Sequence, residues 1–185
     1  MTLSYIPSDT NDEGVLKATA SGVLPNGKAV IVNADGTVSV VAETSFSEAT
    51  GSATVFESAA SENIAITFDS NLNKIVIAFR DTGNSNYGTA IVGTVSSNSI
   101  SFGTAVVFES AATESIAATF DTNSNKVVLC YKDSGNSSRG TSIVGTVSGT
   151  GISFGSAVVF DTSTASDLSA TFDTDTNKVI FAYQQ

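Results

Sequence analysis

Residues 68–81 read FDSNLNKIVIAFRD, and this stretch decides the fold. It recurs at residues 120–133, and a third copy occupies residues 172–183, so successive copies start 52 residues apart. Residues 51–96 and 103–148 align without a gap and share 30 identical residues of 46. A fixed period of this size is typical of repeat architectures, in which each repeat packs against its neighbours.

The apolar end of this stretch predicts a strand that is buried on both faces. Side chains of a strand alternate, so Ile75, Ile77 and Phe79 point one way and Val76 and Ala78 the other. A strand that is apolar on both faces needs a sheet that is covered on both sides. We expect neighbouring copies of the same sheet to supply that cover.

Each repeat offers four short strands, which predicts an all-β protein. The first strands are residues 53–56, 105–108 and 157–160, and the second are 64–68, 116–120 and 168–172. The third are residues 74–80, 126–132 and 178–183, and the fourth are 89–95 and 141–147. Residues 58–62 are expected to form a loop. Four strands in about 52 residues indicate β-propeller-like blades, with stacked β-sandwich or fibre layers as the alternative.

The repeats divide the chain into four parts: an N-terminal hairpin or anchor segment (1–50), repeat 1 (51–102), repeat 2 (103–154) and repeat 3 (155–185). Within the first part, strands at 28–33 and 37–41 flank a turn. Repeat 3 lacks its last strand, so we expect an incomplete propeller. Residues 27–32 resemble 88–93, so the N-terminal segment would be one source of the missing strand. The other source would be more sequence or a second protomer, and the abrupt end of the chain on a core strand favours this explanation.

Composition reduces the number of function classes that this chain can belong to. The formal net charge of −10 disfavours binding to nucleic acid and to anionic membranes. The sequence has no histidine, no run of 18 apolar residues and no signal peptide of the usual kind. Cys130 is the sole cysteine, which excludes an intrachain disulfide, and its counterparts Ala78 and Ala182 indicate a small buried strand residue.

The turn after the second strand carries alternating oxygen side chains. The third copy, Asp173, Asp175 and Asn177, has two carboxylates and is the best candidate for a calcium site. An EF-hand is excluded, because Lys178 stands where that loop requires glycine. The competing interpretation is a tight turn whose Asp and Asn side chains bond their own backbone, with no cofactor.

The next hairpin, residues 81–88 and 133–140, begins Asp-x-Gly-Asn-Ser. This pattern resembles the Asp-box hairpin of sialidase-type propellers, without the aromatic residue that usually ends it. The resemblance implies a blade and no catalytic role, because the motif lies away from the catalytic site in that family. Tyr87 is replaced by Arg139 in the next copy, and this difference makes both candidates for ligand binding, with neutral drift as the alternative.

No set of residues predicts an enzyme. The acidic residues of the repeats have near copies one period away, whereas catalytic sites are normally singular. The Ser-x-x-Lys and Gly-x-Ser-x-Gly patterns are absent from the sequence. We therefore expect a protein without catalytic activity.

Several repeat segments together resemble a known class of repeats. They are Asn-Lys-Val-Val, Asp-x-Gly-Asn-Ser, Gly-Thr-Ala-Ile-Val-Gly-Thr-Val and Ile-Ser-Phe-Gly-x-Ala-Val-Val-Phe, all within residues 51–185. They look like repeats of structural proteins from marine phages, cyanophages above all, and residues 24–38 are similar to segments that precede such repeats. The same motif occurs in large bacterial surface proteins.

The resemblance implies a virion structural protein, such as a tail fibre, head fibre or decoration protein, found in the virion and outside the cell. Its expected partners are other virion proteins, copies of itself or a host surface glycan. Many weak contacts, multiplied by copy number, would supply the binding. A bacterial cell-surface adhesin or lectin-like module is the alternative.

Overall fold

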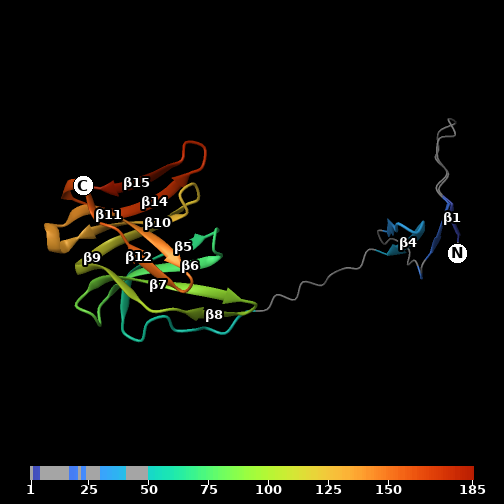
Figure 1. Cartoon of the computed structure of the whole chain (residues 1–185), viewed down its shortest axis with the longest axis horizontal. Coiled ribbons are helices and arrows are strands. Elements are labelled where there is room, and N and C mark those ends of the chain that lie inside the picture. The colour runs from blue at the N-terminus through green and yellow to red at the C-terminus, as the bar shows by residue number, and fades with distance from the viewer. Residues whose placement is uncertain (1, 5–16, 21, 24–29, 41–49) are drawn as a thin grey trace. The chain divides into compact units, whose positions relative to one another are not determined.

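The computed structural model describes residues 2–4, 17–20, 22–23, 30–40 and 50–185 (Figure 1). The chain divides into two compact units, Met1–Glu48 and Ala49–Gln185. Among the described residues the regular elements are strands, together with one 3-10 turn, η1 (Ser134–Asn136). The prediction of an all-β protein is confirmed.

The smaller unit holds a four-stranded sheet in the order β1-β2-β4-β3. Its strands are β1 (Thr2–Ser4), β2 (Lys17–Ala20), β3 (Val30–Val32) and β4 (Thr37–Val40). β3 and β4 pair antiparallel around a turn in which the Asp35 carboxylate accepts a hydrogen bond from the Thr37 backbone N–H at 3.0 Å. The segment suggested as a substitute strand is 27–32; its first half, residues 27–29, lies outside the described residues, and its second half is β3.

The larger unit contains the repeats. Its strands are β5 (Ser61–Asp69), β6 (Lys74–Asp81), β7 (Tyr87–Ser96), β8 (Ser99–Phe102), β9 (Val106–Asp121), β10 (Lys126–Asp133), β11 (Arg139–Ser148), β12 (Gly151–Phe154), β13 (Val158–Thr164), β14 (Ser166–Asp173) and β15 (Lys178–Gln184). Every pair of these strands is antiparallel.

The pairing follows the sequence order. β6 lies between β5 and β7, and the far edge of β7 pairs with β8 and with the beginning of β9. The later part of β9 then pairs with β10, β10 with β11, and the far edge of β11 with β12 and β13. β14 pairs with β15 alone among the described strands.

We call these groups layer 1 (β5 to β8), layer 2 (β9 from Thr113, with β10 to β12) and layer 3 (β14 and β15). The layers are stacked: β9 packs against both β5 and β14, which occupy the same position in the repeat. None of the sheets in the described part of the chain closes on itself. The stack therefore has two open ends.

The main core lies between layers 1 and 2. The side of layer 1 that faces layer 2, its back face, contributes Val76, Ala78, Ala90 and Val92. The front face of layer 2 contributes Ile116, Phe120, Val127, Leu129 and Tyr131. Burying one large apolar side chain stabilises a fold by about 1.5–3 kcal/mol, so the several that are buried here stabilise the junction between the first two repeats.

β6 is buried on both faces, as its sequence predicts. Val76 and Ala78 belong to the core between the layers, while Ile77 and Phe79 belong to a second cluster on the front face of layer 1. Phe56 packs on Phe79 in this second cluster, with ring centroids 5.2 Å apart. The cover on that side comes from Phe56, before β5, and from Phe102 of β8, so the expectation that neighbouring copies supply it is wrong for this face.

Two local predictions are wrong. Residues 53–56 form no strand, although their counterparts at 106–108 and 158–160 do. Those counterparts pair with β7 and β11, strands of the preceding repeat, and the first copy has no preceding repeat in the described part of its unit. The expected loop at 58–62 is strand from Ser61, and its second copy lies within the continuous strand β9.

Candidate interaction surfaces

The two residues predicted to bind a ligand, Tyr87 and Arg139, begin β7 and β11. Both are half-buried, because the register pairs them with Asp81 and Asp133 at the base of each hairpin. Both residues therefore lie at the base of their hairpins and away from the tips. Arg139 Nη1 donates to Asn136 Oδ1 at 3.1 Å, and its buried Nε has no partner. Their role in recognition stays a prediction.

The acidic turn is held by its own backbone. Asp173 Oδ1 accepts hydrogen bonds from the N–H groups of Asp175 and Thr176 at 2.9 and 3.4 Å. The Thr176 hydroxyl donates to the other carboxylate oxygen and is the main cause that lowers the pKa of Asp173 below 3.8. Asn177 closes the turn with φ +54°. These contacts show a turn-forming role for Asp173.

The first two copies of this turn repeat the geometry. Asp69 and Asp121 each accept two backbone N–H bonds, at 2.9 and 3.0 Å. Among the residues that the structure describes, no three carboxylate or thiol groups are placed to hold a metal ion together. Calcium binding by Asp173, Asp175 and Asn177 stays a prediction.

The Asp-x-Gly hairpins pack against the segment that enters their own layer, at Ala59 before β5 and at Ala111 in β9. Asp81 Oδ1 accepts a bond from the Asn84 N–H at 3.1 Å, and the Asp133 hairpin repeats this bond at the same length. A Cβ atom on Gly83 would lie 2.5 Å from the Cβ of Ala59. Glycine is required there because the turn approaches the segment before β5 too closely for a side chain.

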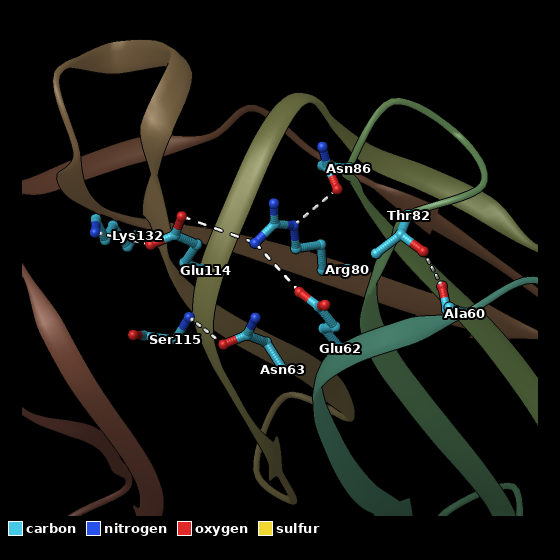
Figure 2. Close-up of polar contacts among 9 residues, drawn as sticks. All are labelled: Ala60, Glu62, Asn63, Arg80, Thr82, Asn86, Glu114, Ser115 and Lys132. Atoms are coloured by element: carbon cyan, nitrogen blue, oxygen red, sulfur yellow. Dashed lines mark hydrogen bonds and ion pairs between the residues drawn. The ribbon is translucent and has the colours of Figure 1, made fainter.

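A row of charged side chains crosses from layer 1 to layer 2 (Figure 2). Arg80 Nη1 lies 3.4 Å from the carboxylate of Glu62 in its own layer and 3.8 Å from that of Glu114 in the next. Lys132 Nζ is 2.8 Å from Glu114, and its hydrogen bond is the main cause that lowers the pKa of Glu114. Exposed ion pairs contribute about 0–1 kcal/mol each, so this row orients the layers more than it stabilises them.

Two neutral contacts in Figure 2 hold the same edge. Asn63 Oδ1 accepts a hydrogen bond from the Ser115 N–H at 3.0 Å, across the two layers. The N–H and hydroxyl groups of Thr82 both donate to the Ala60 carbonyl oxygen, at 3.2 and 2.6 Å. Layer 1 is therefore tied to the chain that enters it and to layer 2.

A tyrosine and an acid pair in two of the three repeats. Tyr131 Oη donates to Glu109 Oε2 at 3.1 Å, and Tyr183 Oη donates to Asp161 Oδ2 at 2.8 Å. Burial raises the pKa of Tyr131 well above its ordinary value of 10.0, and the charge of Glu109 adds to this effect. The hydroxyl therefore stays a donor at neutral pH. Phe79 takes this position in the first repeat.

At both ends of the stack, apolar side chains are exposed whose counterparts in the interior of the stack are buried. On the front face of layer 1, Phe68 is 50% exposed, whereas its counterpart Phe120 in layer 2 is 7% exposed. Ile64 and Ile66 are also exposed beside Phe68. The sequence contains a signal for this surface, because these three apolar residues alternate along β5 and so share one face.

Layer 3 leaves a second apolar surface open. Val144 of β11 is 46% exposed, whereas its counterpart Val92 is fully buried. Val92 is covered because layer 2 contains β11, and layer 3 has no third strand in this structure. Ile180 on β15 is exposed as well. Within residues 155–185, the two strands of layer 3 therefore leave an apolar side chain of β11 uncovered.

A shallow, open depression is lined by Gly51, Ser52, Ser97 and Asn98 and neighbouring residues, none of which titrates near neutral pH. Within the described ranges, no helix is long and apolar enough to cross a membrane. No protein-family model, no curated protein and no solved structure matches the chain.

Proposed function

We propose that this chain is a non-enzymatic structural protein of a phage virion, a fibre or decoration component, which presents stacked β sheets for assembly or for attachment to a host surface. The observation that carries this proposal is the pair of open apolar faces at the ends of the stack. Contiguous exposed apolar side chains mark surfaces that bind other proteins. An assembly protein needs such surfaces, whereas an enzyme needs a pocket with convergent polar groups.

We further propose that each layer is a propeller-like blade. Layer 1 is an antiparallel meander, to which β8 and the beginning of β9 add the fourth, outer strand. Its face-to-face packing on layer 2 through small and branched residues supports this assignment. Stacked fibre layers are the alternative, and they differ only in whether the array curves into a ring.

Attachment would rely on many copies of a weak site. The Asp-x-Gly hairpins occur in the first two repeats, with Tyr87 and Arg139 at equivalent positions. Aromatic and arginine side chains are favoured recognition groups, and a surface glycan offers hydroxyls and apolar ring faces to both. Display of many copies on one particle would raise the effective affinity.

Mass spectrometry of gradient-purified particles tests the proposal. The expected result is that the chain co-sediments with infectious particles in a fixed ratio to the major capsid protein. An antibody against the chain should also label intact particles in electron micrographs. Recovery of the chain from bacterial envelopes, and not from particles, would overturn the virion assignment in favour of a cell-surface adhesin.

A further inference from the structure

We infer that the open front face of layer 1 binds the open back face of layer 3 in a second copy of the chain, so that copies stack head to tail. The front face is formed by Ile64, Ile66 and Phe68 of β5, and the back face by Ile180 and Ala182 of β15. This inference rests on the assembly role proposed above and names its partner.

The argument starts from the interface that the chain already contains. Inside the stack, the back face of layer 1 packs on the front face of layer 2, with Val76 and Ala78 in the same cluster as Ile116 and Phe120. All four side chains are buried. The complement of a front face in this protein is therefore a back face.

The free ends carry the same two surfaces. Ile64 and Phe68 stand one period before Ile116 and Phe120, and Ile180 and Ala182 stand two periods after Val76 and Ala78. Large apolar side chains on both open faces are exposed, with Ile66 at 63% and Ile180 at 48%. Ile66 replaces the smaller Ala118 of layer 2, so the free front face offers more apolar area than the buried one.

The polar contacts at the edge of the interface can also be continued. Asn63 accepts the Ser115 N–H of the next layer, and the residue in the position of Asn63 in the third repeat is Asp167, which is exposed. Asn63, Ser115 and Asp167 share the same backbone conformation, with φ of 48°, 46° and 51°. The Asp167 carboxylate is thus positioned to accept the Asn63 N–H of the following copy.

The charged row creates no repulsion at this junction. Within the chain, Arg80 of layer 1 lies beside Glu114 of layer 2. At the junction, Gln184 of one copy takes the position of Arg80, and Glu62 of the next copy takes that of Glu114. An amide can donate to a carboxylate, so this pair is compatible. The net charge of −10 on each copy opposes association at long range, and salt screens that repulsion. Apolar association between like-charged copies therefore strengthens as salt is added.

Sedimentation velocity of the purified full chain tests the inference, from about 1 to about 100 μM protein and at about 0.15 and 1 M salt. The expected result is concentration-dependent association that increases with salt. Ile66→Asp on the front face and Ile180→Asp on the back face should each raise the dissociation constant at least about tenfold. Leu72→Ser is the matched control, because Leu72 is exposed at a turn where the other repeats have Ser124 and Thr176.

Mixing the two blocked variants distinguishes head-to-tail stacking from a symmetric dimer. Ile66→Asp keeps a free back face and Ile180→Asp keeps a free front face, so the mixture should form a 1:1 dimer that grows no further. A heterologous interface predicts this rescue, and an isologous one does not. Self-association of Ile180→Asp alone at the wild-type level would overturn the inference, as would a wild-type chain that is monomeric under all these conditions.

A cross-link supplies a readout that does not depend on apolar substitutions. In a Cys130→Ala background, Asn63→Cys and Asp167→Cys chains should form a disulfide-linked heterodimer when mixed and oxidised. Homodimers alone, or no cross-link, would contradict the proposed register. These experiments use purified protein, so a failure here leaves the virion test unaffected, and absence of the chain from particles leaves these results unaffected.

Discussion

Asn63 Oδ1 accepts a hydrogen bond from the backbone N–H of Ser115, at 3.0 Å and a separation of one repeat period. The two residues occupy the same position in consecutive copies, so the contact joins equivalent points of two layers. Both adopt the left-handed backbone conformation, which is uncommon for residues other than glycine. The geometry of one repeat is therefore linked directly to that of the next.

Loss of this acceptor should weaken the stack. We expect Asn63→Ala to lower the free energy of unfolding by about 1–2 kcal/mol, because it removes the hydrogen bond and places alanine at positive φ. Asn63→Asp keeps the acceptor, as Asp167 does in the third repeat, and should change stability by less than about 0.5 kcal/mol. Urea denaturation measures both. Equal losses in the two variants would show that the acceptor contributes nothing.

Phe68 and Phe120 occupy equivalent positions but differ in burial, and this difference allows a test of the open front face. Phe120→Ala should lower the free energy of unfolding by about 3–5 kcal/mol, because Phe120 is buried between layers 1 and 2. Phe68→Ala removes the equivalent but half-exposed ring, and should cost less than half as much. Denaturation at low protein concentration measures both without self-association. A cost for Phe68→Ala that matches Phe120→Ala would contradict the view that the front face is open.

Much of this fold could be predicted from sequence because the deciding signals are local. Alternation along residues 74–80 predicts the two-sided burial of β6, which the structure confirms. Asp and Asn residues after β5 predict a turn, and the bonds accepted by Asp69 show one. The same local pattern recurs every 52 residues, so each prediction is supported by more than one copy of the pattern.

The parts that could not be predicted depend on which segment lies beside which. Residues 53–56 have the composition of a strand, yet they lack the partner that residues 106–108 find in β7. A strand needs a partner for its backbone groups, and the sequence of one segment does not contain that information. The half-burial of Tyr87 likewise follows from its register with Asp81.

The acidic turn predicts a specific response to metal ions. Asp173→Asn should lower the melting temperature in the presence of EDTA, because the amide accepts the backbone bonds of the turn less strongly than the carboxylate does. Asp175→Asn leaves those bonds intact and should have little effect under the same conditions. If the turn only folds the chain, adding calcium to the wild type leaves its melting temperature unchanged. A rise with calcium that Asp175→Asn abolishes would instead identify a cation site.

Acid should destabilise the last repeat through Asp161. The Ser163 N–H, with the Gln185 and Tyr183 side chains, lowers the pKa of Asp161 from 3.8 to about 2. A carboxylate with a lowered pKa contributes stability that is fully present above pH 4 and is lost as the pH falls toward 2. We expect the wild-type melting temperature to fall through this window.

Asp161→Asn isolates that contribution from those of the other carboxylates with lowered pKa values. The variant should be less stable than the wild type at pH 7 and should lose less stability between pH 4 and pH 2. Tyr183→Phe removes one of the three donors and should give an intermediate profile. Thermal melts at closely spaced pH values provide the comparison. Parallel profiles for the wild type and Asp161→Asn would show that the carboxylate gains nothing from its partners.

Alkali should act through the buried thiol of β10. Burial raises the pKa of Cys130 from 9.0 to about 12, and its side chain is fully buried. Below pH 9 the folded and unfolded thiols are both protonated, and above it only the unfolded one ionises. The free energy of unfolding therefore falls by about 1.4 kcal/mol for each pH unit above 9, until the folded thiol ionises as well.

Cys130→Ala is the matched variant, because alanine occupies this position in the first and third repeats as Ala78 and Ala182. It should cost about 1 kcal/mol at pH 7, from the lost sulfur contacts. Since the variant has no thiol to ionise, its disadvantage should shrink as the pH rises from 9 to 11 and then reverse. Tyr131 titrates in both proteins and cancels from the difference. A difference that stays constant across this range would mean that the folded chain lets the Cys130 thiol ionise as easily as the unfolded chain does.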